Sequence, residues 1–362
     1  MTSQSYSTII YENEIPSFAE SELKRLYSCL YSTLPQLLVN APAEINTYVA
    51  SEYGEMKSLL LFEIRGSAIR ILNEGIRIDN EEIRRFSKYV FERYPSVKRI
   101  SLHAVDGMLG KDMLPCQQYI VLEDIVLAIP DSADAYLSSL GKSTRSYINR
   151  YLNRIRREHP TFKCEVYIND EFDKNDIIEL IDIHRQRMSS KEKISIIDDK
   201  RIEQIFDLLR IMGLVVIVRI DGKVCAGTIN YQVGDHYFLE TVAHNPAFND
   251  YRIGTICSYL TICECIARAG KEYHFLWGEY DYKYRLGGIK RELSDLFIYR
   301  SRAHYFLNSA FFLKVASKNR IHQIKKRLQH TANQPQNTLA SRMAANVLHM
   351  LQKGKHILTP SS

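Results

Sequence analysis

The sequence contains no run of about 18 apolar residues, no Cys-x-x-Cys pair, and no acidic residue among its last 62 positions. The first of these absences argues against a membrane-spanning helix. The first thirty residues also carry Glu12, Glu14 and Glu20, where a secretory signal needs a basic start and an apolar stretch. We therefore expect a cytoplasmic protein.

The cysteines are too scattered to build a disulfide framework or a metal site. There are seven, an odd number, and Cys263 and Cys265 lie two apart in a predicted helix, where they cannot share a face. We expect reduced, buried thiols. Of the 362 residues 45% are hydrophobic, which is enough for the cores of two or three domains and excludes a disordered chain.

Positive charge is concentrated in the stretch that lacks acids. The last 62 residues hold ten Lys and Arg, so the first 300 residues carry a net charge of −4 although the whole chain carries +6. Helices are predicted there at 305–316, 318–328 and 339–351. Two interpretations stay open: these are solvated helices, or they dock on an anionic partner such as a membrane surface or tRNA.

Hydrophobic periodicity predicts a chain that mixes helices and strands. We expect helices at 17–38, 43–56, 80–94, 142–158, 173–189, 200–212 and 254–269, with a short one ending at 140, and strands at 58–65, 68–72, 97–103, 117–129, 163–168, 214–220, 224–233, 236–243, 273–277 and 295–300. A hairpin, a helix and two strands occur at 58–129 and recur, with one more strand, at 214–300. This recurrence predicts two copies of one α/β domain.

The loop that leads from the strand at 236–243 into the next helix has the composition of an anion site. Its first backbone N–H groups converge on one spot, which suits a pyrophosphate. The candidate binding residues are Val242, Ala243, Asp250, Tyr251, Arg252, Ile253, Gly254 and Thr255. Gly254 allows close approach and Arg252 adds positive charge. The equivalent loop of the first half carries Glu74 and Asp79, which disfavour phosphate, so no cofactor is expected there.

Three further segments are distinctive: LSSLGKSTR at 137–145, IHRQR at 183–187, and GEYDYKYRLG at 278–287. With the three-stranded meander at 214–243 they resemble one branch of the GNAT acyltransferase superfamily. This branch is the two-lobed family of the cellulose-biosynthesis-type acetyltransferases, which is related to the Fem-type transferases. The last segment is similar to the family's Gly-Asp-x-x-Tyr-Lys signature, with Glu279 in place of Asp. The phosphate loop departs from the usual GNAT pattern and keeps only Gly254.

The resemblance implies a mixed α/β fold with two tandem GNAT-like lobes, each a mostly antiparallel sheet flanked by helices. We place a degenerate N-terminal lobe at 1–130, an acyl-CoA-binding GNAT domain at 131–304 and a basic helical tail at 305–362. The implied co-substrate is acetyl-CoA or another acyl-CoA, and no metal is expected.

Transfer to an amine requires that the acceptor ammonium lose a proton before it attacks the thioester. Glu240 is the first candidate base because it interrupts an apolar strand beside the phosphate loop, although a Glu on the solvent face of the strand explains it too. Asp281 is the second, and its alternative role is an ion pair with Lys283 or Arg285. Tyr282 is a candidate for protonating the leaving thiolate, as a tyrosine does in many GNAT enzymes.

His184 and Arg187 share one helix face and match the family's His-x-x-Arg. With Lys283 they are the candidates for binding the acceptor, and a surface pair is the alternative. The helix at 142–158 has six positive charges and no acid up to position 157. This cationic face is either solvated or contacts CoA phosphates, an anionic acceptor or tRNA.

These patterns predict an acyl-CoA-dependent N-acyltransferase that acetylates a small-molecule amine, an amino sugar or a natural-product intermediate by direct attack on the thioester. Two alternatives stay open. One is a Fem-like transferase that draws an aminoacyl group from tRNA, and the other is a catalytically inactive GNAT-fold binding protein.

Overall fold

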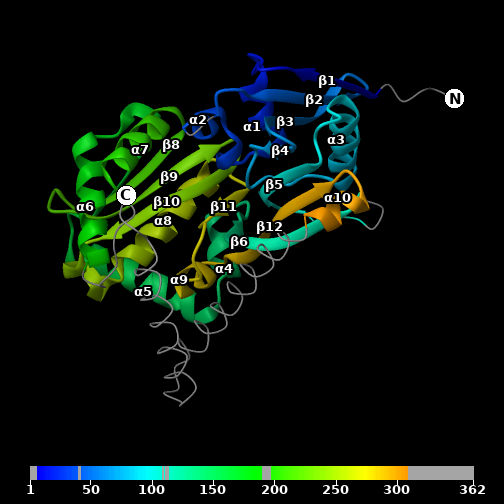
Figure 1. Ribbon diagram of the computed structural model, residues 1–362. Coiled ribbons are helices and arrows are strands. Elements are labelled where there is room, and N and C mark those ends of the chain that lie inside the picture. The colour runs from blue at the N-terminus through cyan, green and yellow to red at the C-terminus, as the bar shows by residue number, and fades with distance from the viewer. Residues whose placement is uncertain (1–5, 40–41, 108–109, 111–113, 190–196, 309–362) are drawn as a thin grey trace, which may run out of the picture.

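The computed structural model describes residues 6–39, 42–107, 110, 114–189 and 197–308 (Figure 1). Its first half contains β1 (Tyr6–Tyr11), α1 (Ala19–Tyr27), η1 (Leu30–Ser32), α2 (Leu34–Leu38), β2 (Asn46–Glu52), β3 (Glu55–Arg65), β4 (Ala68–Ile71), α3 (Asn80–Arg93), β5 (Arg99–Val105) and β6 (Cys116–Ala128). Its second half contains α4 (Ala133–Ser139), α5 (Lys142–Glu158), β7 (Lys163–Ile168), η2 (Asn169–Glu171), α6 (Lys174–Ser189), α7 (Asp199–Met212), β8 (Gly213–Ile220), β9 (Lys223–Val233), β10 (His236–His244), η3 (Pro246–Tyr251), α8 (Ile253–Ala267), β11 (Glu272–His274), α9 (Asp281–Arg285), β12 (Ile289–Tyr299) and α10 (Arg302–Leu307).

The strands form one continuous twelve-stranded sheet in the order β1-β2-β3-β4-β5-β12-β6-β11-β10-β9-β8-β7. Its only parallel pairs among the described strands are β4 with β5 and β10 with β11. Read from one edge the sheet runs β1 to β5 and then β12, and read from the other edge it runs β7 to β11 and then β6. The two series correspond strand by strand. The two halves of the chain therefore build corresponding lobes, and the predicted mixed α/β fold is confirmed.

The two lobes exchange their last strands. β6, from the first half, pairs with β11 of the second lobe, and β12, from the end of the second half, pairs with β5 of the first lobe. β6 and β12 pair with each other along ten residue pairs at the centre of the sheet and join its two halves. The predicted boundary at residue 130 thus divides the chain but not the sheet, and the proposed domain ranges stay a prediction.

Helices cover both faces of each lobe (Figure 1). In the second lobe, α6 and α7 pack on one face through residues such as Leu180 and Leu209. On the opposite face α4, α5 and α8 pack through Tyr136, Ile148 and Ile256. In the first lobe α3 covers one face and α1 the other. The short η1 helix bridges the lobes, since Tyr31 packs against the cores of both.

Two predicted helices near the N-terminus are wrong. Residues 43–56 form strand β2 and its turn instead, because β2 lies between β1 and β3 and both of its faces are covered, which hides a period of two. The predicted helix at 17–38 is broken at Ser28, which adopts a left-handed conformation, and at Thr33, which is extended before α2. Strand β1 and helix α9 were not predicted.

Most of the other elements match the predicted ones closely. β3 begins at Glu55 rather than 58, α10 begins at Arg302 rather than 305, and two further strands differ in length. β11 ends at His274 rather than 277, because Leu276 has a positive φ of 55°. β12 begins at Ile289, because it pairs with β6 along its whole length. The predicted tail helices lie outside the described residues beyond α10. No described helix is long and apolar enough to cross a membrane.

Candidate functional site

Two neighbouring strands of the second lobe separate where the sequence predicts a thioester. β10 pairs with β11 only from His236 to Phe238, although β10 continues to His244. A bulge between Leu239 and Thr241 bends β10 at the point where this pairing ends. Within the described strands, the edge of β10 beyond Phe238 has no partner on the β11 side. Apart from Val242, whose backbone hydrogen bonds with His184, this edge offers its backbone groups to a ligand.

The N-terminus of α8 lies at the end of that open edge. Arg252 precedes the helix in a left-handed conformation, and no side chain caps it. Among the described residues, no hydrogen bond takes up the N–H of Ile253 or Gly254. Gly254 packs so tightly on His244 that an added Cβ would lie 2.5 Å from its Nδ1. These features form an uncapped, positively polarised helix end, which is a site for an anion.

The predicted phosphate-loop residues are brought together only in part. Arg252, Ile253, Gly254 and Thr255 surround the start of α8, with Arg252 exposed to solvent. The other four point elsewhere or supply only backbone: Ala243 is buried in the core under α6, Val242 packs in the α8 core, Asp250 is exposed, and the Tyr251 hydroxyl donates to Glu158 of α5 at 2.8 Å.

The basic helix α5 lies beside this helix end. Burial raises the pKa of its Tyr147, and two groups at the start of α8 oppose this rise: Thr255, within hydrogen-bond reach, and the charge of Arg252. Arg154 stacks on the Tyr251 ring at 4.9 Å and binds Glu158 at 3.1 Å. Four more cations of α5 are exposed to solvent: Lys142, Arg150, Arg156 and Arg157. The α5 surface therefore adds positive potential near the α8 N-terminus.

His184 and Arg187 do lie together, at the open end of β10. His184 Nδ1 is 3.2 Å from the hydroxyl of Thr241, and Arg187 Nη1 is 3.4 Å from His244 Nδ1. Burial, with the nearby charge of Arg187, lowers the pKa of His184. An imidazole that is neutral at neutral pH can accept a proton. The predicted pair thus faces the strand opening rather than bulk solvent.

Glu240 occupies the bulge of β10 and is held by Arg201 of α7. The guanidinium donates to both carboxylate oxygens, at 2.6 and 3.1 Å. The side chain of Glu240 is only 12% exposed, so it is not on the solvent face. Because Arg201 engages both oxygens, a proton taken up by Glu240 weakens this ion pair.

The signature loop forms the short helix α9, which separates its three candidates. Asp281 is 90% exposed and lies 3.5 Å from Arg285. Tyr282 packs against the α8 core, and burial raises its pKa to about 12. Lys283 is buried, and its ammonium donates to the carbonyls of the chain that follows β11, Phe275, Leu276 and Trp277, at 2.6–3.0 Å. Lys283 therefore holds the irregular end of β11 in place.

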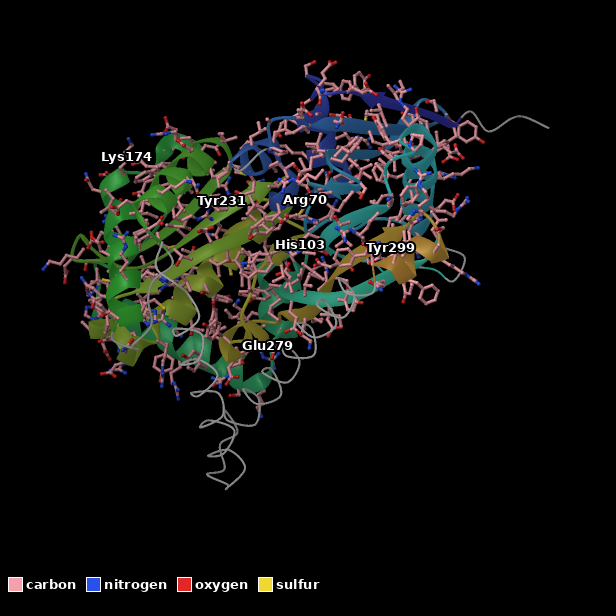
Figure 2. All side chains as sticks on the ribbon, viewed as in Figure 1. Arg70, His103, Lys174, Tyr231, Glu279 and Tyr299 are labelled. Atoms are coloured by element: carbon pink, nitrogen blue, oxygen red, sulfur yellow. The ribbon has the colours of Figure 1, made fainter. Side chains whose placement is uncertain are left out.

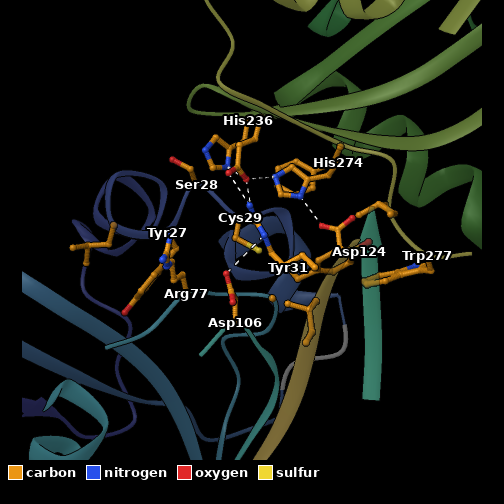
Figure 3. Close-up of a pocket in the computed structure, with 17 residues that line it drawn as sticks. Tyr27, Ser28, Cys29, Tyr31, Arg77, Asp106, Asp124, His236, His274 and Trp277 are labelled. Carbon is orange, nitrogen blue, oxygen red and sulfur yellow. Dashed lines mark hydrogen bonds and ion pairs between the residues drawn. The ribbon is translucent and has the colours of Figure 1, made fainter. Parts of the chain in front are cut away.

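Sequence reasoning missed a pocket of about 360 Å³ between the lobes (Figure 3). Tyr31 and Trp277, whose rings lie 5.2 Å apart, form part of its wall. Polar residues of both lobes line the rest: Arg77, Asp106, Asp124, His236, Glu272, His274 and Arg291. Leu276 and Trp277 also line it, so the pocket adjoins the stretch where β11 leaves β10.

A network of charged side chains crosses this pocket. His274 donates from Nδ1 to Asp124 at 2.6 Å, and Arg291 donates to both oxygens of Glu272 at 2.8 and 3.0 Å. Burial opposes a charge on His274, but the hydrogen bonds with Asp124 and Glu272 outweigh it and raise its pKa. The sequence signal was present: Asp124 and His274 each interrupt an apolar strand. Only the exchange of β6 between the lobes brings them together.

Residues 142–284 match the family model of the acetyltransferase (GNAT) domain. The crystal structure of FemX is similar to the fold, with a TM-score of 0.58 at 12% identity, over 82% of this chain and 99% of that one. A conserved protein of unknown function from Bacteroides thetaiotaomicron has a TM-score of 0.52 at 10% identity, over 81% of this chain and 100% of that one. No curated protein matches the chain significantly. The predicted GNAT domain is confirmed over residues 142–284, and the likeness to FemX concerns the fold alone.

Proposed function

We propose that the protein transfers an acyl group from acyl-CoA, acetyl-CoA being the simplest case, to the amine of a small polar molecule. The observation that carries the proposal is the uncapped start of α8 at the end of the open edge of β10. The free N–H groups of Ile253 and Gly254, with Arg252, would hold the pyrophosphate. The unpaired edge of β10 would hydrogen bond with the pantetheine arm. The thioester would then lie where β10 and β11 separate.

The first lobe lacks the corresponding feature. α3 occupies the position of α8, but Asp79 caps it by accepting from the N–H of Glu81 at 2.8 Å. Glu81 and Glu82 add two further negative charges in the first turn. This end of α3 repels an anion, so we assign the donor to the second lobe alone.

The reaction needs a proton acceptor and a proton donor at the strand opening. The amine nitrogen attacks the thioester carbon, the C–S bond breaks, and the sulfur leaves as a thiolate. The amine proton goes to His184 or to Glu240, directly or through water, and its uptake by Glu240 weakens the ion pair with Arg201. Tyr282, which keeps its proton at neutral pH because its pKa is about 12, would supply a proton to the thiolate. We do not assign either proton transfer to Asp281, because its side chain is 90% exposed.

We place the acceptor in the pocket between the lobes. The half-buried carboxylate of Asp106 suits a cationic amine, and the aromatic wall of Tyr31 and Trp277 suits the body of a small molecule. Arg77 offers a contact for an anionic group on the same acceptor. This arrangement favours a polar, amine-bearing compound.

Aminoacyl-tRNA is the second candidate donor. The exposed arginines of α5 favour it, because a cationic helix face beside the donor site can contact tRNA phosphates. The third candidate, an inactive binding protein, would hold a ligand between the lobes and transfer nothing.

The experiment compares Gly254→Glu with the matched variant Asn80→Glu, which adds a Glu to the corresponding helix α3 of the first lobe. Calorimetric titration with acetyl-CoA should show saturable binding to the wild type and to Asn80→Glu. Gly254→Glu should lose it, because its Cβ meets His244 and its charge faces the pyrophosphate. Unchanged acetyl-CoA affinity in a folded Gly254→Glu protein contradicts the proposal. Stabilisation of the wild type by aminoacyl-tRNA and not by acetyl-CoA would support the second donor.

A further inference from the structure

We propose that His236, Glu272 and His274 form a binding site for a divalent transition-metal ion of the zinc class in the pocket between the lobes. One ligand atom from each of the three side chains lies within 4.8 Å of the other two. The site goes beyond the acyl transfer proposed above and does not depend on the donor.

The sheet itself arranges these ligands. Glu272 and His274 are two residues apart on β11, so their side chains leave the same face of the sheet. His236 is the Cα partner of Glu272 on the parallel strand β10. Two alternate residues of one strand and one residue of its neighbour thus converge from three directions. Figure 3 shows both imidazoles at the same end of the pocket.

The distances are close to what a tetrahedral ion needs. Ligands at 2.0–2.1 Å from zinc are roughly 3.4 Å from one another. His274 Nε2 lies 3.3 Å from Glu272 Oε2, and His236 Nδ1 lies 3.9 Å from the same oxygen. The half-buried His236 side chain must rotate to bring its Nδ1 into this range. Three protein ligands leave a fourth position open toward the pocket.

His274 is oriented as metal-ligating imidazoles usually are, with a carboxylate hydrogen-bonded to its far nitrogen. Asp124 holds Nδ1 of His274 at 2.6 Å, which directs Nε2 at the proposed ion. This buried Nε2 atom faces Glu272 Oε2 at 3.3 Å. In His236, Nε2 lies 3.6 Å from Asp235 and Nδ1 is the atom that faces Glu272. Phe238 stacks on His274 at 4.3 Å and fixes the ring plane.

The local charge accommodates a dication. With neutral imidazoles, the three carboxylates of Asp124, Asp235 and Glu272 face the two cations Arg291 and Lys271. Arg291 binds Glu272 but does not exhaust it, because each carboxylate oxygen has two lone pairs. Two imidazoles with one carboxylate favour zinc over magnesium or calcium, which prefer all-oxygen sites.

The first lobe supplies a control with the same hydrogen bond and no metal site. His103 of β5, labelled in Figure 2, binds Asp295 of β12 through Nδ1, also at 2.6 Å. No second histidine joins it in any metal-ligand group of the described residues. Changing His103 removes a histidine and its carboxylate contact but should leave metal binding untouched.

The test uses full-length, tag-free protein, first stripped with chelator and then titrated with Zn²⁺ by calorimetry and with Co²⁺ by absorption spectroscopy. We expect one ion per chain and the intense visible bands of tetrahedral Co²⁺. His236→Asn and His274→Asn should weaken binding at least about 100-fold, and Asp124→Asn by about 10–100-fold. His103→Asn should bind as the wild type does.

The half-buried His236 is the variant most apt to stay folded, so its circular dichroism spectrum is compared first. Failure to take up one equivalent of Zn²⁺, or equal binding by folded His236→Asn, overturns the proposal. Gly254→Glu should retain the ion, because its lesion is at the donor site. Loss of acetyl-CoA binding and loss of metal binding are therefore read separately.

Discussion

Glu240 and Arg201 form an ion pair. We predict that removing either charge alone lowers the unfolding free energy by more than removing both charges together. Glu240→Gln leaves the guanidinium of Arg201 with a neutral amide oxygen as its acceptor. Arg201→Gln leaves the carboxylate of Glu240, whose side chain is only 12% exposed, without its counter-charge. The partner that remains loses its counter-charge without regaining full hydration. The double variant has no such orphan.

The magnitude follows from burial and geometry. Breaking a fully buried ion pair by removing one partner costs about 3–5 kcal/mol. The side chain of Arg201 is 27% exposed, so water partly replaces the lost contact. We therefore expect each single variant to lose about 2 kcal/mol of unfolding free energy, and the coupling between them to be at least about 1 kcal/mol.

The assay is a double-mutant cycle measured by urea unfolding, with acyl-transfer kinetics on the same four proteins. A positioning role predicts similar losses of kcat in both single variants and little further loss in the double variant. A base role predicts that Glu240→Gln lowers kcat by about 10²–10⁴ while Arg201→Gln is far less affected. A coupling energy near zero would refute the reasoning, because it would mean that the two side chains do not interact in solution.

Two further residues give predictions of their own. Lys283→Met should lower the unfolding free energy by about 2–4 kcal/mol, because three carbonyls at the end of β11 lose a charged donor. Thermal unfolding measures this loss of stability, and an unchanged stability would contradict the assigned role. The pKa of His184 is lowered on folding, so the unfolded chain binds more protons just below its ordinary value of about 6.5. Stability from this residue is full above that pH and is lost as pH falls through the folded-state pKa. The stability advantage of wild type over His184→Gln should shrink on acidification, and a growing advantage would reverse the sign and reject the argument.

Periodicity and turn chemistry in the sequence were sufficient for most elements of the second lobe. α5 has the predicted bounds of 142–158, and the meander of β8, β9 and β10 lies where two hairpin turns place it. Local signals suffice there because each helix has a clear apolar stripe and each turn has its own Gly or Asp. They failed at β2, whose two buried faces hide the alternation of a strand.

The candidate site was only partly visible in the sequence. The loop at Arg252 and Gly254 and the helix pair His184 and Arg187 were found, because spacing along one segment determines which of their side chains can meet. The partner of Glu240 was not, since Arg201 lies 39 residues away on another helix.

What the sequence alone determined is the class and order of most elements, and the residues that start α8. What only the tertiary structure decided is which distant side chains become neighbours. Asp124 meets His274 across 150 residues because β6 crosses into the second lobe, and His236 meets Glu272 because β10 and β11 run parallel for three residues. Strand exchange and register arise from packing of the whole sheet, and no local pattern encodes them.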